Sequence, residues 1–365
     1  MLASNPVSFA CKITYNPGRE ASRAIQNEWG IALEPAESVA EIVRRNHSGP
    51  PRGRQTAQDQ RTRILKPLDS AEDTIALIAA VSCVPRAEVK ERLISEAAEI
   101  GSNVYRGMKA QDIPLYVPSE KLDRFYVESD TFLYETTVWN ACSAKQNMRT
   151  FVSSRLDQFG KSSAEVFCFG DGLGFDSTYL AQCGHRVRYF EPSLRCQEYA
   201  RQVFQRNQAD IKHLHAMEDL QDGSLDAVVC LDVLEHIPQP QELVKLFYRL
   251  LKPNGLLFVH APFWCIHWTR STHLKQNRHF SGDLKHLYEA HCFSALDSSV
   301  FWDPILFQKS NNSPAFNRAT SASCRIWLGK LLLTIGRWDS AVHTWIARKI
   351  ARPPKSWIAS LHKAE

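Results

Sequence analysis

The sequence predicts an α/β fold, in which a doubly wound, mostly parallel sheet follows a helical extension and precedes a helical tail. From residue 164 onward, short apolar runs alternate with helix-like segments, and this order calls for parallel strands joined by right-handed crossovers. Glycines at positions 170, 172 and 174 separate the first apolar run from the first such helix. A glycine-rich turn at this point is typical of the ligand-binding edge of a doubly wound sheet.

The elements of the alternating region can be placed in order along the chain. Strands are expected at 164–169, 186–190, 211–215, 226–231 and 255–261, and helices at 175–183, 193–206, 239–251 and 281–290. Two further runs, 293–301 and 304–309, are expected to pair antiparallel at the sheet edge. Before the sheet, residues 69–101 and 119–159 have helical patterns that end at glycines.

The composition is that of an ordinary soluble globular protein. Of the 365 residues, 44% are hydrophobic and 23% are charged, and the net charge of +5 permits an anionic partner without requiring one. The ten cysteines are scattered singly and form no CxxC pair, so neither a zinc ribbon nor a thioredoxin-like motif is expected. No apolar run approaches the ~20 residues that a membrane span needs. We therefore expect a cytoplasmic protein.

The segment from Val166 to Glu191 carries the strongest functional signal. A strand, a glycine turn, a helix and a second strand follow one another, and the second strand leads into the acid Glu191. Glycines let backbone N–H groups approach a ligand closely, and the start of the helix adds a partial positive charge. An acid about twenty residues after the first glycine is placed to bond ribose hydroxyls. This segment therefore predicts a site for an adenosine-containing cofactor.

Three features, taken in order, separate the alternatives for that cofactor. The glycine turn lacks the last glycine of the GxGxxG dinucleotide pattern, because Phe175 and Asp176 follow the third glycine. The run SLDAVVCLDVLEHIP (224–238) is a buried strand followed by an acidic loop. The run LLKPNGLLFVHAPF (250–263) is a helix end, a turn and a further strand. Together these motifs, which fall within residues 164–263, resemble the class I S-adenosylmethionine-dependent methyltransferases.

The resemblance implies S-adenosylmethionine as the cofactor and assigns residues to it. Gly170, Gly172 and Gly174 would line its methionine and ribose portion. Glu191 would hold the two ribose hydroxyls. Glu218, between the third and fourth strands, would sit near the adenine.

The resemblance also implies acids near the sulfonium and the amino group of the cofactor. Asp232, just after the fourth strand, would face the cofactor beside its sulfonium. The family usually carries an acid two residues before the first glycine, where this chain has Cys168. That acid helps to hold the cofactor's ammonium group, and Asp171 inside the turn is the candidate to replace it. Without a replacement, the cofactor would bind weakly or the site would be degenerate.

Candidate catalytic residues follow the fourth and fifth strands, where ligands gather in open α/β sheets. Glu235, His236, His267 and His273 are candidates to accept a proton from an acceptor hydroxyl. The loop 260–280 is rich in histidine and tryptophan, so it could wall an aromatic acceptor pocket. Alternatively, the histidines of this loop are polar residues exposed to solvent. His236 could likewise order the loop in which it lies rather than take part in the reaction.

Some histidines of this loop could instead be metal ligands, namely His267, His273 and His279. Their spacing matches no standard ligand pattern, so no metal site is predicted.

The chain is expected to divide into five segments. These are a short helical N-terminal segment (1–46), a disordered linker (47–65), a helical cap or dimerisation region (66–160), the cofactor-binding methyltransferase domain (161–310), and a linker with amphipathic C-terminal helices (311–365). On a helix, the tryptophans of the tail would fall beside basic residues. That pattern suits either packing against the protein itself or peripheral contact with a membrane.

The predicted function is methyl transfer from S-adenosylmethionine to a small organic acceptor by in-line displacement, with a hydroxyl favoured as the acceptor group. One alternative is a non-catalytic S-adenosylmethionine-binding scaffold or sensor, which the cysteine at position 168 motivates. A nicotinamide-dependent oxidoreductase is another, and the failed GxGxxG pattern disfavours it. No nucleic-acid partner is expected, because CLDVLEHIP stands where an amine-methylating loop would be. A homodimer is compatible with the helical region.

Overall fold

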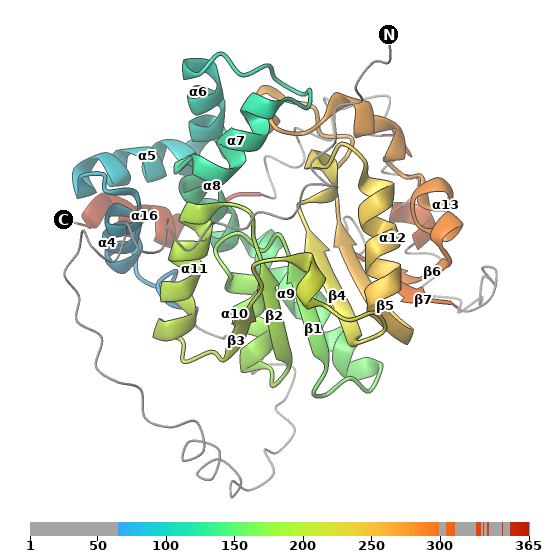
Figure 1. Cartoon of the computed structure of the whole chain (residues 1–365). Helices are drawn as coiled ribbons and strands as arrows, with labels where there is room; N and C mark the ends of the chain where they lie inside the picture. The colour runs from blue at the N-terminus through green and yellow to red at the C-terminus, as the bar shows by residue number, and fades with distance from the viewer. Residues whose placement is uncertain are drawn as a thin grey trace, which may run out of the picture.

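The computed structural model describes residues 65–298, 304–310, 326–329 and 351–364 together with positions 331, 334, 335 and 345. Its centre is a seven-stranded sheet with the strand order β3-β2-β1-β4-β5-β7-β6 (Figure 1). The strands are β1 (Glu165–Phe169), β2 (Arg186–Phe190), β3 (Ile211–His213), β4 (Leu225–Leu231), β5 (Leu251–His260), β6 (Phe293–Ser298) and β7 (Ile305–Lys309). The first five are parallel, and β7 pairs antiparallel with both β5 and β6.

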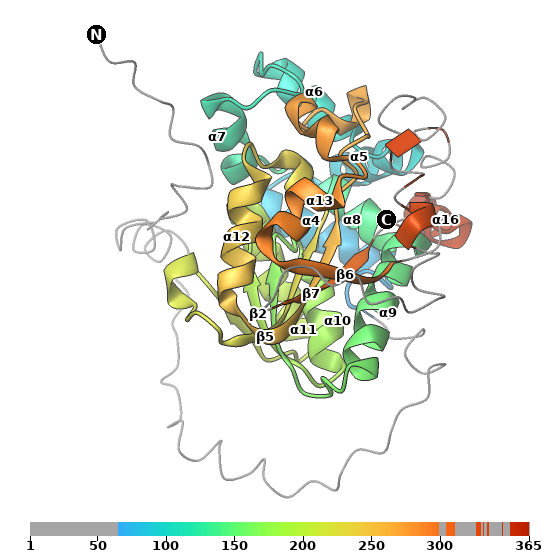
Figure 2. The same cartoon turned by 90° about the vertical axis from the view of Figure 1, so that its right-hand side faces the viewer.

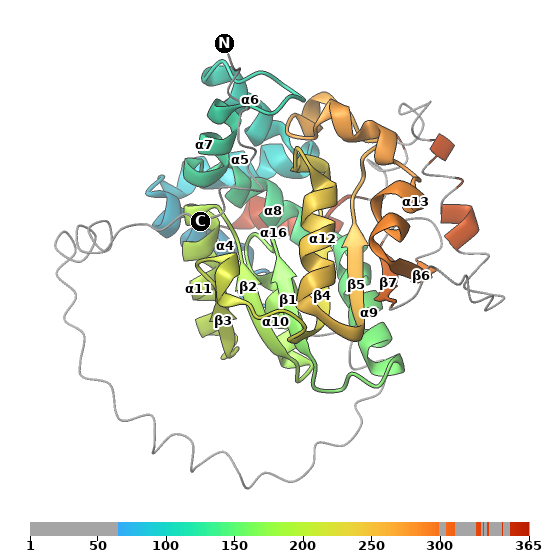
Figure 3. The same cartoon turned by 45° about the vertical axis from the view of Figure 1, so that its right-hand side comes forward.

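Helices cover both faces of the sheet because successive strand residues point to opposite sides. In β1, Val166 and Cys168 belong to the core that α10 (Phe175–Gln182) and α11 (Leu194–Arg206) complete. Phe167 and Phe169 belong to the core on the other face, where α12 (Pro240–Leu250) and α13 (Leu284–Leu287) pack. Figure 3 shows α12 lying across the sheet in front of β4 and β5. Both faces of the central strands are therefore buried, as a parallel sheet requires.

A helical extension precedes β1. It comprises α4 (Ala71–Ser82), α5 (Arg86–Ala98), α6 (Ser102–Ala110), α7 (Glu120–Glu128), α8 (Thr131–Ala141) and α9 (Ser143–Gln158). Figures 1 and 2 show α6 and α7 beyond the end of the sheet at which the parallel strands finish. The C-terminal helix α16 (Lys355–Lys363) packs against α4 and α5. The extension thus covers the edge of the sheet at which the glycine turn lies.

The doubly wound sheet and the order of its elements agree with the sequence prediction, and the antiparallel edge pair is present. The differences between prediction and structure concern the number of helices and the residues at which they end. The pattern at 119–159 forms three helices rather than one, because Ser129 and Cys142 adopt extended backbone at the ends of α7 and α8. The expected helix at 281–290 is reduced to α13 and a short 3₁₀ turn, and α6 was not expected.

Several predictions concern residues that the structure does not describe. The N-terminal helices and the linker before residue 65, and most of the amphipathic tail, lie outside the described residues. Within the described part of the chain, no helix is long and apolar enough to cross a membrane. Homodimerisation and contact with a membrane surface stay predictions.

Candidate functional site

The glycine turn after β1 has a backbone that side chains would disturb. Gly170 has a φ of 69°, and a Cβ added there would lie 2.6 Å from Cγ2 of Val233. Gly172 has a φ of 56°, and its added Cβ would meet only the Thr136 side chain, at 3.5 Å. Because side chains with a Cβ rarely adopt such φ values, glycine is favoured at both positions. The turn therefore presents bare backbone beside the cavity described below.

Glu191 follows β2 and closes this turn. Its carboxylate accepts hydrogen bonds from the backbone N–H groups of Gly172 and Ser193, both at 2.9 Å. The side chain is buried, and burial raises the pKa of the carboxyl to about 7 despite these two bonds. Gly172 and Glu191, nineteen residues apart in sequence, are thus joined directly.

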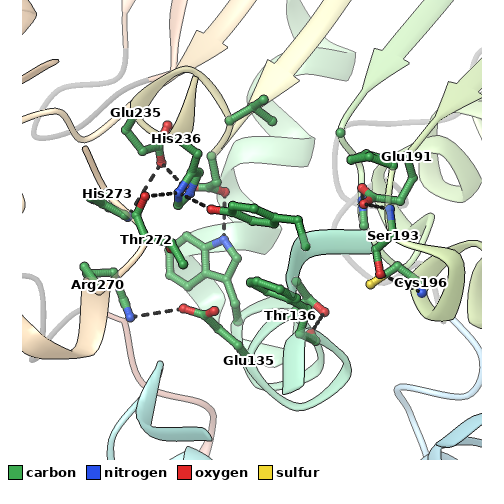
Figure 4. A pocket seen from close by; sticks show the side chains of 18 of the residues that line it. Glu135, Thr136, Glu191, Ser193, Cys196, Glu235, His236, Arg270, Thr272 and His273 are labelled. Carbon is green, nitrogen blue, oxygen red and sulfur yellow. Dashed lines mark hydrogen bonds and ion pairs between the residues drawn. The ribbon is translucent and has the colours of Figure 1, made fainter. Parts of the chain in front are cut away.

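One large cavity, of about 990 Å³, opens above the carboxyl ends of the strands. Gly170, Gly172 and Glu191 line one part of it, and Glu235, His236 and His273 line another. Figure 4 shows Glu191 and Ser193 across the cavity from that second group. Helices α5, α7 and α8 contribute further walls. A cavity of this volume can hold a nucleoside-sized molecule together with a small second one.

Asp232 lies at the end of β4 and also lines the cavity. Its carboxylate accepts hydrogen bonds from the Trp139 indole (2.8 Å) and the Lys145 ammonium (3.1 Å), and it lies 2.6 Å from Nδ1 of His260. Burial raises the pKa of Asp232, but His260 and Lys145 outweigh burial and hold that pKa well below its usual range. Asp232 is therefore an ionised carboxylate fixed by three partners.

The surroundings of Cys168 contain a buried ion-pair network in place of the expected acid. Nζ of Lys145 lies 3.0 Å from Asp176 and 3.1 Å from Asp232, and Nε of Arg149 lies 2.8 Å from Asp176. Cys168 is buried in the core, and burial raises its thiol pKa well above the ordinary value, so the thiol is neutral. The acids in this region are thus Asp171, Asp176 and Asp232.

Several predicted site residues lie away from the cavity. Asp171 accepts hydrogen bonds from the N–H groups of Asp176 and Ser177, so it caps α10 and does not line the cavity as a replacement acid. Glu218 is exposed on a short 3₁₀ turn, and His215 lines the cavity instead.

Two more predicted residues have local structural positions. Gly174, with a φ of 76°, precedes α10 and faces Phe204 rather than the cavity. His267 begins a 3₁₀ turn and lies 2.9 Å from the Thr269 hydroxyl, and it too is absent from the cavity wall. The structure therefore does not bring either residue to the site.

Glu235, His236 and His273 form a cluster in which Glu235 and His273 are buried and His236 is half-buried. The Glu235 Oε1 atom lies 3.7 Å from Nε2 of His236 and 3.9 Å from Nε2 of His273. One atom of each residue falls within 4.8 Å of the others, so the three could hold a metal ion. Burial lowers the pKa of His236 to about 4 and that of His273 well below its ordinary value, which keeps both rings neutral. The cluster joins two predicted catalytic loops.

The helical extension and the loop after β5 add further residues to this side of the cavity. Arg270 lies 3.4 Å from Glu135 of α8, and burial raises the pKa of Glu135 to about 7 although Arg270 opposes that rise. Tyr126 of α7 places its hydroxyl 2.8 Å from Nδ1 of His236. Figure 4 shows Glu135 and Arg270 beside the cluster. No spacing pattern could have revealed these contacts, because they join helices before the sheet to loops after it.

Comparison with known proteins agrees with this geometry. Residues 167–259 match the family model described as a methyltransferase domain. A similar protein is the ubiquinone biosynthesis O-methyltransferase of Xanthomonas oryzae pv. oryzae, 34% identical over 113 residues that cover 30% of this chain and 46% of that protein. The protein of the same name from Xanthomonas campestris pv. campestris is 30% identical over 129 residues, covering 33% and 54%. The chain spans about half the length of these relatives.

Solved structures with a related fold include two methyltransferases. One is the 1,6-didemethyltoxoflavin-N1-methyltransferase of Burkholderia thailandensis with 1,6-didemethyltoxoflavin and S-adenosylhomocysteine bound, at 16% identity and a TM-score of 0.35, covering 46% of this chain and 82% of that chain. The other is a SAM-dependent methyltransferase from Aquifex aeolicus, at 16% identity and a TM-score of 0.35, covering 42% and 85%.

Proposed function

We propose, from the premise that residues 167–259 form a class I S-adenosylmethionine-dependent methyltransferase domain, that this chain methylates a hydroxyl group of a small organic acceptor. The observation that carries the proposal is the shared cavity, because Gly172 and Glu191 line one part of it and the Glu235–His236–His273 cluster lines another. A methyl donor and an acceptor must meet in one enclosed space for in-line displacement.

The cavity wall around the glycine turn fits the cofactor. A side chain at position 172 would fill the space that glycine leaves open for the cofactor. The carboxylate of Glu191 is held in place by two backbone N–H groups. Each carboxylate oxygen has a further lone pair, so Glu191 can also accept hydrogen bonds from ribose hydroxyls. We assign Gly170, Gly172 and Glu191 to the nucleoside, and Asp232 to the neighbourhood of its sulfonium. The assignments of Gly174, Asp171 and Glu218 are not carried forward.

The cluster supports a hydroxyl as the acceptor group. S-adenosylmethionine supplies a methyl group that its positive sulfonium has already activated. The protein must then orient the acceptor oxygen and receive its proton. Glu235, His236 and His273 bring a carboxylate and two imidazoles together in one wall of the cavity, so they form its proton-accepting part. The name O-methyltransferase of the Xanthomonas relatives agrees with this choice of acceptor.

The remaining walls orient the acceptor and exclude water. The Tyr126 hydroxyl fixes the ring of His236, and the buried indole of Trp264 adds an apolar surface. Because α7 and α8 cover the cavity from the helical extension, an acceptor bound there would be shielded from bulk water. The extension would therefore select the acceptor, and the sheet would bind the cofactor.

Calorimetry with S-adenosylhomocysteine, followed by a product assay, tests this proposal. Wild-type protein should bind the ligand, and Gly172→Val should lose binding because a side chain fills the turn. With S-adenosylmethionine and a panel of phenols and hydroxy acids, mass spectrometry should detect an O-methylated product. Binding without product from any acceptor would favour the scaffold reading. Folded wild-type protein that binds NADH but not S-adenosylhomocysteine would overturn the proposal.

A further inference from the structure

We propose that Glu235, His236 and His273 bind one divalent metal ion of the zinc type in the wall of the cavity. The three side chains come from two loops, one after β4 and one after β5, and they converge on the cavity (Figure 4). The ion would contact the acceptor rather than Glu191, which lies across the cavity.

The separations between the donor atoms are close to those of a metal site. Zinc lies about 2.1 Å from nitrogen and oxygen ligands, so two ligands of a tetrahedral site are about 3.4 Å apart. The Glu235 Oε1 atom lies 3.7 Å from Nε2 of His236 and 3.9 Å from Nε2 of His273. These distances are too long for hydrogen bonds, and small side-chain rotations would bring them to the spacing of ligands. The geometry therefore suits a shared cation better than direct hydrogen bonds.

The hydrogen bonds of His236 leave the correct nitrogen available. Its Nδ1 atom lies 3.2 Å from the backbone carbonyl of Thr272 and 2.8 Å from the Tyr126 hydroxyl. Because a carbonyl oxygen only accepts hydrogen bonds, this contact assigns the proton to Nδ1. The lone pair is then on Nε2, which faces the Glu235 carboxylate. A metal-binding histidine usually has this arrangement, with its other nitrogen donating to a carbonyl.

The two loops that supply the ligands are fixed to each other. The N–H of Leu274 donates to the carbonyl of Glu235 at 2.9 Å. The side-chain amide of Asn277, which is buried, donates to the carbonyls of Ile237 (2.8 Å) and Glu235 (3.3 Å). The loop with His273 therefore cannot move independently of the loop with Glu235 and His236. Such support holds ligands in place before the ion binds.

The nearby cations already have partners. The Arg270 guanidinium lies 3.4 Å from Glu135 and donates to the carbonyl of Ile100 at 2.7 Å. Lys145 lies between Asp176 and Asp232. A divalent ion at the cluster would place positive charge beside the buried side chain of Glu235.

The donor set indicates the class of metal. Two imidazoles and one carboxylate suit zinc and similar first-row ions, whereas magnesium and calcium prefer oxygen ligands alone. Three protein ligands leave at least one position for a molecule in the cavity, as in catalytic zinc sites. With the ion bound, the cluster would act through the metal rather than accept the proton itself: a hydroxyl oxygen in that position would lose its proton to water more readily and would then take the methyl group as the carbon–sulfur bond breaks. This role in catalysis rests on the proposed function, but the binding of the ion does not.

Calorimetry of the full-length, chelator-treated protein with Zn²⁺ alone tests the site, and Co²⁺ provides a visible absorption spectrum. We expect one ion per chain, and a loss of affinity of at least about tenfold in Glu235→Gln and in His273→Gln. His279→Gln is the matched control, because His279 is exposed and its ring contacts the Gln276 carbonyl and the Phe280 ring rather than the cluster. The control should bind the ion as the wild type does. Thermal melting would establish that each variant is folded.

The outcomes separate this proposal from the proposed function. Folded wild-type protein that binds S-adenosylhomocysteine but no Zn²⁺ would overturn the metal site alone. Equal Zn²⁺ affinity in the wild type, Glu235→Gln and His273→Gln would overturn it too, because the ion would then be bound elsewhere. A protein that binds Zn²⁺ at the cluster but neither S-adenosylhomocysteine nor S-adenosylmethionine would keep the metal site and overturn the proposed function.

Discussion

The two sides of the cavity are built in different ways. On the side that we propose for the cofactor, Gly170, Gly172 and Glu191 lie within a short stretch of chain, and backbone N–H groups make the contacts. On the side that we propose for the acceptor, Tyr126, Glu235 and His273 come from three separate segments, and side chains make the contacts. A site made from local backbone can be recognised from the sequence. A site made by distant side chains depends on the whole fold.

Replacing a cluster residue should give the largest effect and should leave the cofactor side intact. We expect Glu235→Gln to lower turnover by about 100- to 10,000-fold, because the acceptor oxygen loses the group that draws off its proton. Its affinity for S-adenosylhomocysteine should match that of the wild type. Single-turnover kinetics and calorimetry measure the two quantities. A parallel loss of both would mean that the two sides are not separate.

Replacing Glu191 should have the opposite pattern. Glu191→Ala removes the acceptor of two buried backbone N–H groups, so the affinity for S-adenosylhomocysteine should fall by about 10- to 100-fold. Zn²⁺ binding should not change. Glu198→Ala is a suitable control, because Glu198 is a half-buried residue of the neighbouring helix α11 whose carboxylate pairs with Arg201 rather than with the glycine turn. Unchanged affinity in Glu191→Ala would remove this residue from the cofactor site.

Loosening the loop support should reduce stability by a smaller amount. Asn277→Ala would leave the carbonyls of Glu235 and Ile237 without a side-chain donor, at a cost of about 1–3 kcal/mol in the free energy of unfolding. The same variant should weaken Zn²⁺ binding while sparing S-adenosylhomocysteine. Denaturant unfolding and calorimetry give both values. Asn277→Asp, which removes the donor but keeps the shape, should behave like Asn277→Ala if the hydrogen bonds matter.

The pH dependence of cofactor affinity should be the smallest effect. Burial raises the pKa of Glu191 to about 7 in the free protein. Ribose hydroxyls that donate to the carboxylate favour its ionised form, so binding lowers this pKa and, by linkage, affinity increases with pH. Between about pH 6 and about pH 8, S-adenosylhomocysteine should bind a few-fold more tightly. Glu191→Gln should remove most of this pH dependence. A wild-type affinity for S-adenosylhomocysteine that falls as the pH rises would contradict the prediction.

The sequence was sufficient for the sheet and for the place of the glycine turn. Alternating apolar runs predicted every strand of the sheet, and the glycine turn and Glu191 lie together beside the cavity. Their role in binding the cofactor stays a prediction. Among the candidate bases, Glu235, His236 and His273 line the cavity, whereas His267 does not. The pattern could not separate them, because whether a loop histidine points inward depends on packing against the helical extension.

Two departures have clear physical reasons. Asp171 was expected beside the cofactor, but the free N–H groups at the start of α10 are nearer and take its carboxylate. Arg270 and Glu135 were not expected at all, since an ion pair between residues 135 positions apart leaves no local signal. Long-range pairs of this kind are where sequence patterns carry the least information.

The structure of the complex with S-adenosylhomocysteine tests the central claim most directly. We predict that the ribose hydroxyls lie within hydrogen-bond distance of the Glu191 carboxylate and that the sulfur faces Asp232 and the Glu235–His236–His273 cluster. A ligand bound outside this cavity, or a Glu191 side chain turned away from the ribose, would contradict the account.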